Sequence, residues 1–165
     1  MNSRFMGMVL VLLSLTIVAG AQTKTSGVVK CDKPSQPQKL DIGDKPNHSL
    51  IMAQIHCTWT KPMEIAGTET KEDTVTFSNE ASGMKAQGHG FVVGTLASGD
   101  KFYARTHGTD KYNKDGTVES SDGTFTFAGG TGKVRRIAGT GTFKGKPDPD
   151  GNIIYTVDAA YELPK

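Results

Sequence analysis

Apolar and polar side chains alternate along most of the chain after residue 49. Residues 51–59 place apolar side chains at every second position and end on Trp59, and residues 153–162 repeat this pattern up to Tyr161. A period of two predicts strands with one apolar face. Turn-forming residues separate the runs, most clearly at 148–151. No segment has a convincing helical period, so we expect roughly seven or eight short antiparallel strands.

The predicted fold is all-β, an antiparallel barrel of about eight strands that occupies residues 49–165. A closed barrel is favoured over a sandwich because closure removes exposed strand edges. Gly139 and Gly141 lie inside a strand pattern, where glycines mark the bends that barrel corners need. The interior of a barrel of about eight strands is either filled by side chains or holds one small ligand.

The two faces of the strand predicted at 101–107 differ in chemistry. One face carries Phe102 and Ala104, and the other carries Tyr103, Arg105 and His107. The more apolar face usually points inward, which predicts an apolar interior, whereas the opposite register would give a polar interior suited to an anion. On the expected register, four aromatic side chains line or fill the interior, and either core packing or ligand contact explains them. These candidate ligand-binding residues are Trp59, Phe102, Tyr155 and Tyr161.

Residues 1–21 have the organisation of a cleavable signal peptide. Arg4 provides a positive start, an apolar run covers residues 6–18, and Ala19-Gly20-Ala21 forms a small-residue cleavage site. The run is shorter than the roughly 20 residues that span a bilayer, although an uncleaved anchor helix is the alternative. We therefore expect a secreted or periplasmic protein that begins at Gln22 and has no membrane attachment after cleavage.

Residues 22–48 are polar, contain three prolines and predict a flexible arm before the barrel. Export places the two cysteines in an oxidising compartment, where a pair usually forms a disulfide. A Cys31–Cys57 bond would close a loop of roughly 27 residues and tie the arm to the first strand. The alternative, a reactive or metal-binding thiol pair, is weakly supported because the spacing is not that of a CxxC motif.

Charge and motif spacing exclude several classes of function. The formal net charge is +2, and charges of both signs are interspersed, so no basic face for nucleic acid is expected. The run before Lys133 lacks the spacing of a phosphate loop. Residues 111–122 resemble a calcium loop but begin with a lysine, and no two histidines have metal-ligand spacing. We expect neither a metal nor a cofactor, and the sequence leaves the oligomeric state open.

One segment resembles a known family. Residues 127–139 read Phe-Ala-Gly-Gly-Thr-Gly-Lys-Val-Arg-Arg-Ile-Ala-Gly, and Thr-Gly-Thr-Phe follows. This segment is similar to the motif shared by allene oxide cyclases and plant dirigent proteins, which have a GGTG turn, a basic residue, an aromatic residue and a glycine at the position of Gly139. Val134 stands where the family usually has Phe. The structural motif consists of Gly129, Gly130, Thr131, Gly132 and Gly139.

The resemblance implies an eight-stranded, calycin-like antiparallel barrel with an apolar cavity, in a secreted bacterial branch of that superfamily. The glycines of the motif suit a tight turn, because glycine adopts positive φ without strain. The family's catalytic acids do not align onto particular positions of this chain, so the resemblance supports the fold more than the chemistry.

Three functions remain open. The first is a secreted barrel that binds a small apolar molecule, and the second is a non-enzymatic envelope scaffold. The third is an isomerase or cyclase of the allene oxide cyclase type, which needs a carboxylate inside the cavity. The candidate carboxylates are Glu64, Glu69, Glu119 and Asp158. No catalytic signature occurs, so binding or scaffold roles are favoured over catalysis.

Overall fold

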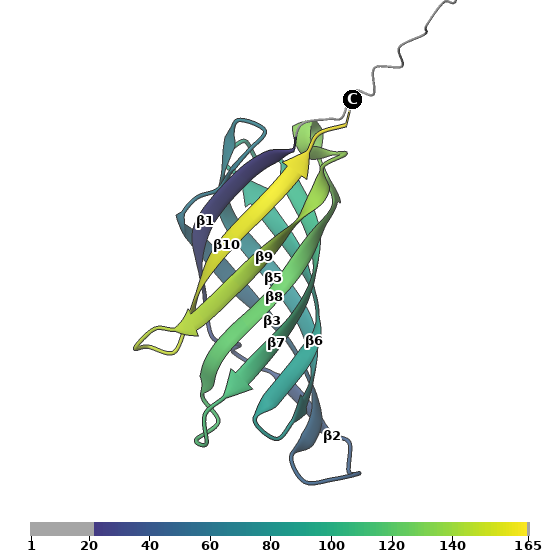
Figure 1. The fold of residues 1–165 in the computed structure, drawn as a ribbon, viewed down its shortest axis with the longest axis vertical. Helices are drawn as coiled ribbons and strands as arrows, with labels where there is room; N and C mark the ends of the chain where they lie inside the picture. The colour runs from purple at the N-terminus through teal and green to yellow at the C-terminus, as the bar shows by residue number, and fades with distance from the viewer. Residues whose placement is uncertain (1–21, 165) are drawn as a thin grey trace, which may run out of the picture.

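The computed structural model describes residues 22–164, which form a closed antiparallel barrel (Figure 1). The predicted signal peptide, residues 1–21, lies outside the described residues. Eight long strands build the wall, which confirms the expected all-β fold. They are β1 (Thr23–Cys31), β3 (His48–Lys61), β5 (Thr68–Ser82), β6 (Lys85–Leu96), β7 (Lys101–Tyr112), β8 (Val118–Gly130), β9 (Ala138–Pro147) and β10 (Ile153–Glu162). Three short elements join them: β2 (Gln38–Asp41), β4 (Glu64–Ile65) and the 3-10 turn η1 (Gly132–Val134).

Strand β3 closes the barrel because it pairs with β1 on one edge and β5 on the other. From β5 to β10 each strand pairs with the next along the chain, and β1 then fits between β10 and β3. The first half of β3 pairs with the short β2 instead of β1. The wall is therefore shorter where β1 ends and where β9 turns into β10 (Figure 1).

The first barrel strand lies inside the segment that was expected to be a flexible polar arm, so the expected domain boundary at residue 49 is wrong. Residues 23–31 form β1 and pair along their whole length with β10, from Thr23↔Tyr161 to Cys31↔Ile153. Ladder hydrogen bonds and a few inward side chains order this strand despite its polar composition. Val29 is buried, and Gly27 leaves the space that the Trp59 ring and Met63 fill.

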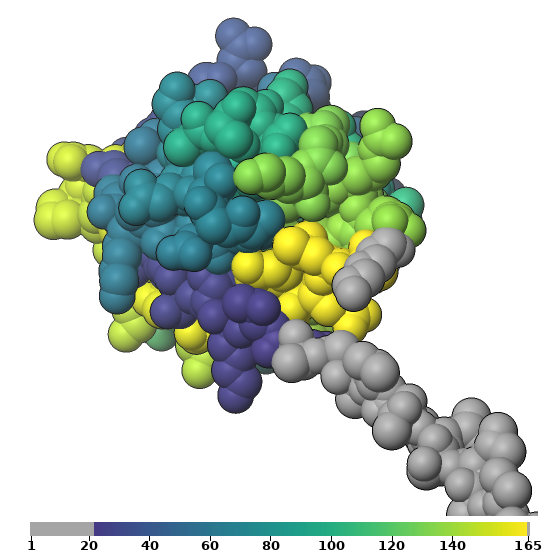
Figure 2. Space-filling model, turned by 90° about the horizontal axis from the view of Figure 1, so that it is seen from above, coloured from purple at the N-terminus to yellow at the C-terminus, as the bar shows by residue number. Residues whose placement is uncertain are grey.

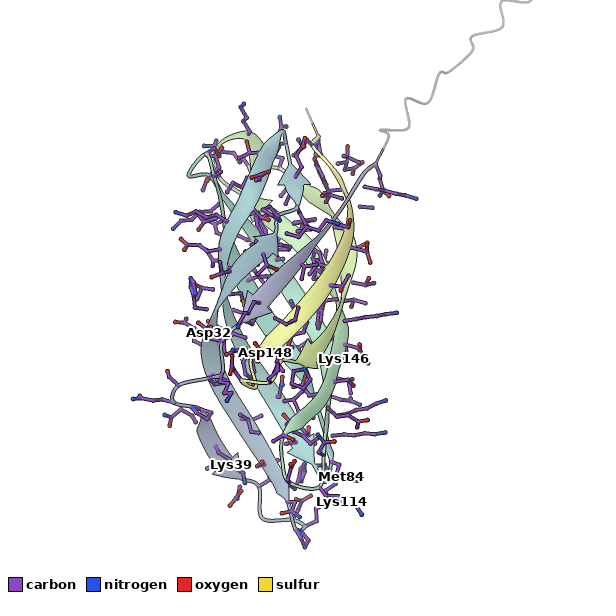
Figure 3. All side chains as sticks on the ribbon, turned by 90° about the vertical axis from the view of Figure 1, so that its left-hand side faces the viewer. Asp32, Lys39, Met84, Lys114, Lys146 and Asp148 are labelled. Atoms are coloured by element: carbon purple, nitrogen blue, oxygen red, sulfur yellow. A yellow bond between two sulfur atoms is a disulfide. The ribbon has the colours of Figure 1, made fainter. Side chains whose placement is uncertain are left out.

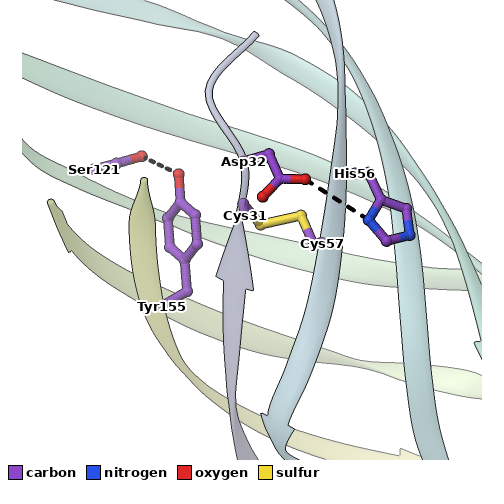
Figure 4. Close-up of a disulfide and its surroundings, with 6 residues drawn as sticks. All are labelled: Cys31, Asp32, His56, Cys57, Ser121 and Tyr155. Atoms are coloured by element: carbon purple, nitrogen blue, oxygen red, sulfur yellow. Dashed lines mark hydrogen bonds and ion pairs between the residues drawn. A yellow bond between two sulfur atoms is a disulfide. The ribbon is translucent and has the colours of Figure 1, made fainter. Parts of the chain in front are cut away.

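The predicted disulfide is present and lies in the barrel wall. Cys31 and Cys57 are directly opposite each other in the β1–β3 ladder, and both are buried (Figure 4). The bond fixes the last residue of β1 to β3, and the chain then leaves the wall. It therefore joins two barrel strands.

One end of the barrel is filled with side chains. Met63, Ile65 and Val134 are almost completely buried there. The main chains of Met63 and Thr70 bond to each other, and the Thr70 hydroxyl also accepts the Met63 N–H. Figure 2 looks onto this end and shows closely packed atoms. Access to the interior is therefore from the other end.

The glycine motif builds part of this closed end. The expectation of positive φ holds for Gly129 and Gly132, whose φ angles are 100° and 48°. After this turn the chain forms η1, which places Val134 over the core, and β9 begins only at Ala138. Gly139 has a φ of 139°, and a Cβ there would collide with the backbone of Ala160. The motif thus caps the barrel through backbone shapes that other residues rarely adopt.

Candidate functional site

The interior of the barrel holds a cavity of about 830 Å³. Inward positions of all eight wall strands line it, and most of their side chains are apolar. On β7, Phe102 and Ala104 face the cavity, which confirms the expected apolar register. The alternate residues of that strand, such as Arg105, lie on the outer face, where its guanidinium stacks on Phe91.

Three of the four aromatic candidates line the cavity. Trp59, Phe102 and Tyr155 do so from β3, β7 and β10. Tyr161 is instead buried in the closed end, where its ring packs against Phe127 and its hydroxyl accepts the N–H of Ala66 at 3.0 Å. Tyr161 therefore helps to seal the barrel, and its predicted contact with a ligand finds no support in this geometry.

A carboxyl group lies deep in the apolar part of the cavity. Asp73 on β5 is 6 % exposed and is opposite Cys57 and Gly94 in the two adjoining ladders. Burial raises the pKa of this carboxyl to about 7, although the Trp59 indole partly offsets the effect. Neither Asp73 Oδ1 nor Trp59 Nε1 has a hydrogen-bond partner of normal geometry among the described residues. This carboxyl can therefore gain or lose a proton near neutral pH.

A polar cluster occupies the cavity wall nearer the open end. Asn79 Nδ2 donates to Asp110 Oδ2 at 2.9 Å, and the Tyr155 hydroxyl donates to Ser121 Oγ at 3.0 Å (Figure 4). Burial raises the pKa of Asp110, and contacts with Ser121 and Asn79 oppose this rise. Burial also raises the pKa of Tyr112 and Tyr155 to about 12, so both phenols stay neutral.

Three loops surround the open end. They are the segment after β1 with Lys33, the β7–β8 turn with Thr117, and the β9–β10 turn with Asp148. Lys30 binds Asp148 at 2.9 Å, which fixes the β9–β10 turn beside β1. Figure 3 shows Asp32 and Asp148 at the level where β1 ends, with Lys39, Met84 and Lys114 farther toward the tips of the longer strands. The cavity thus has a definite mouth on the side where the wall is short.

The carboxylates proposed from the sequence do not reach the cavity. Glu64, Glu69, Glu119 and Asp158 are all exposed, so each of these assignments is wrong. The cavity acids are Asp73 and Asp110, which sequence reasoning missed. A signal existed for Asp73, because it lies two and four residues before Val75 and Phe77 and therefore shares their face.

The histidines do not form a joint site. His56 is on the outer face near Asp32 and Glu72, whereas His107 stacks with His89 at a ring-centroid distance of 4.7 Å. Among residues 22–164, no group of three or more His, Cys, Asp or Glu side chains is arranged to hold a metal ion. Within the same residues, no helix has the length and apolar character to cross a membrane.

Comparison of the chain with protein-family models and with curated proteins finds no match.

Proposed function

We propose that this protein is an exported barrel that binds a small, largely apolar molecule in its interior. The cavity of about 830 Å³ carries the proposal. Its volume lies within the roughly 300–1,000 Å³ typical of small-molecule pockets, and its wall combines apolar surface with a few polar groups, as such pockets do. The closed end and the open mouth give a ligand one route in and out.

Export is supported by two independent features. Residues 1–21 have the charge, apolar run and small-residue site of a signal peptide. The buried Cys31–Cys57 disulfide is typical of proteins that fold in an oxidising compartment. We place the mature protein in the periplasm or outside the cell.

We also propose kinship with the allene oxide cyclase and dirigent superfamily. The eight-stranded barrel, its apolar cavity and the glycine turn at 129–132 support this kinship. This kinship does not identify a substrate, because barrels of one superfamily can have different functions.

Binding can be tested with the neutral dye Nile red, whose emission rises in apolar surroundings. The purified mature protein is expected to raise the emission saturably, and a matched pair of variants tests the location of the dye. Thr106→Phe fills the cavity and is expected to abolish binding, whereas Thr124→Phe, on the outer face of β8, leaves it unchanged. An equal response in both variants, or no saturable emission at all, would overturn the proposal.

A second candidate, isomerisation inside the same cavity, is favoured by Asp73. A carboxyl with a pKa of about 7 in an apolar pocket can act as both proton acceptor and donor. Mass spectrometry and chromatography of the natural ligand before and after incubation would reveal an isomer of equal mass. If Asp73 transfers the proton, the variant Asp73→Asn still binds the ligand but does not convert it. Conversion by that variant would exclude Asp73 as the catalytic group.

A scaffold role is the third candidate, and exposed apolar side chains outside the barrel favour it. Phe91, Val93 and Tyr103 lie on the outer face of β6 and β7. A protein that binds no small molecule but retains this surface would fit that role.

A further inference from the structure

The ionisable groups inside the cavity have one sign. Asp73 and Asp110 are on inward positions of β5 and β7. Among the described residues that line the cavity, Lys33 is the single cationic side chain, and it lies at the mouth against Gly151. Buried charges in proteins are usually paired. When these carboxyls are ionised, a cation that pairs with them must therefore come from outside the cavity wall.

Aromatic rings accompany the carboxyl group nearer the mouth. Tyr112 and Tyr155 are close enough to Asp110 for its charge to raise the pKa of both phenols. Phe143 packs edge-on against Tyr155 with ring centroids 5.6 Å apart and also lines the cavity. Carboxylates attract ammonium groups by charge, and aromatic faces attract them by cation–π interaction.

The Asp110 carboxylate keeps acceptor capacity for a ligand. Asn79 donates one hydrogen bond to Oδ2, and Ser121 also contacts the carboxyl. Asp122, the other charge that acts on this group, is negative and lies on the outer face. A positively charged ligand group would thus meet attraction from each charge around Asp110.

We infer that the ligand is an elongated apolar molecule with a protonated amine, which binds beside Asp110 while its apolar chain extends toward Trp59. This inference rests on the proposed function. Asp73 and Asn79, the partner of Asp110, are six positions apart on β5, which corresponds to about 20 Å along the strand. A chain of ten carbons or so fits between these two levels.

The same arrangement selects against anions. A fatty-acid carboxylate at the mouth would face Asp110, and one at the deep end would face Asp73. Like charges in poorly hydrated surroundings repel strongly, so the cavity discriminates by repulsion as well as by attraction.

The test compares three ligands of equal length by their displacement of Nile red at pH 7: decylamine, 1-decanol and decanoate. We expect decylamine to displace the dye at a concentration at least about tenfold lower than decanol, and decanoate to be the weakest. Equal displacement by amine and alcohol, or a preference for decanoate, would overturn the inference. If the dye itself does not bind, the proposed function fails first, so the two failures are distinguishable.

Two variants locate the amine. Asp110→Asn is expected to reduce the preference for decylamine over decanol to about one, whereas Asp122→Asn, which changes an exposed acid nearby, keeps it. Retention of the preference in Asp110→Asn would contradict the assignment. If Asp110→Asn does not fold, wild-type protein titrated from pH 7 to pH 3 replaces it, because the raised pKa of Asp110 means that this carboxyl takes up a proton in that range while the amine stays charged, so the preference for decylamine must fall. A preference that is the same at pH 3 as at pH 7 would also contradict it.

Discussion

Asn79 on β5 donates a hydrogen bond to Asp110 on β7 across 2.9 Å, although β6 lies between these two strands. Gly88 on β6 makes this possible, because it is opposite Asn79 in the ladder and has no side chain to block the contact. The bond orients Asp110 in the cavity wall. Three strands thus contribute to the position of one carboxyl group.

Gly88→Ala should therefore destabilise the barrel. A Cβ at this position would collide with the Asn79 side chain and with the Ser78 carbonyl, which is part of the backbone. Overpacking of this kind costs about 1–3 kcal/mol. Urea unfolding followed by Trp59 fluorescence measures the loss, with Gln87→Ala on the exposed face of the same strand as control. Equal stability of the two variants would contradict the role given to Gly88.

Asp73→Asn should stabilise the protein at alkaline pH. The folded pKa of Asp73, about 7, is above the ordinary value of 3.8 for this carboxyl, so the stability that its protonated form contributes is complete below pH 4 and is lost as the pH rises through 7. A difference of about three units corresponds to roughly 4 kcal/mol at pH 8. Unfolding free energies of both proteins from pH 4 to pH 8.5 test this, and Asp158→Asn on the surface is the control. A parallel pH profile for wild type and Asp73→Asn would refute the burial argument.

His48 should make the β2–β3 hairpin sensitive to pH. Its Nδ1 is 2.5 Å from Asp44 Oδ1 and its Nε2 is 2.8 Å from Glu80 Oε1, and these bonds raise the pKa of the histidine. Only the protonated ring donates to both, so this contribution is present below pH 6.5 and is lost as the pH rises through the raised folded pKa. The same contact lowers the pKa of Asp44. In strong acid Asp44 takes up a proton, and the hydrogen bond between Asp44 and His48 becomes weaker again.

Hydrogen exchange of residues 38–52 provides the readout. Wild-type protein should protect this segment better at pH 6 than at pH 8.5, after correction for the intrinsic exchange rate. His48→Gln should reduce this pH dependence, and an unchanged dependence in that variant would assign it to another group.

Loss of the disulfide should lower stability without changing the cavity. The bond closes a loop with a sequence separation of 26, for which the chain-entropy model gives about 3–4 kcal/mol. Cys31→Ser with Cys57→Ser is expected to unfold at lower urea and still bind Nile red. Reduction of the wild-type protein should reproduce the same shift in midpoint.

The sequence carried the strand pattern but not the position of every strand. The alternation that ends at Tyr161 predicted β10 correctly, because every inward residue is apolar or aromatic and the outward face carries Thr156, Asp158 and Glu162. Strand β1 was missed because Gly27 occupies an inward position, where the Trp59 ring fills the core in place of a large side chain. Periodicity alone does not reveal a strand whose core-facing space is filled from a neighbour.

The candidate site was predictable only in its apolar part. Trp59 and Phe102 follow from alternation, since the more apolar face points inward. Asp73 and Asp110 break that alternation, so a rule that places only apolar side chains inside passes over both, although Asp73 shares the face of Val75 and Phe77. Tyr161 shares the inward face but is near the end of β10, so its depth depends on how η1 and β4 close the barrel.

We propose that the cavity holds a small molecule, and mass spectrometry of the mature protein from its export compartment is the direct test. We expect a denatured mass that begins at Gln22 and is two hydrogens lighter than the reduced chain, with extra mass in the native spectrum that is lost on denaturation. Extra mass of an apolar amine would also agree with the charge inside the cavity. A bare native mass that decylamine and Nile red both fail to increase would contradict the claim.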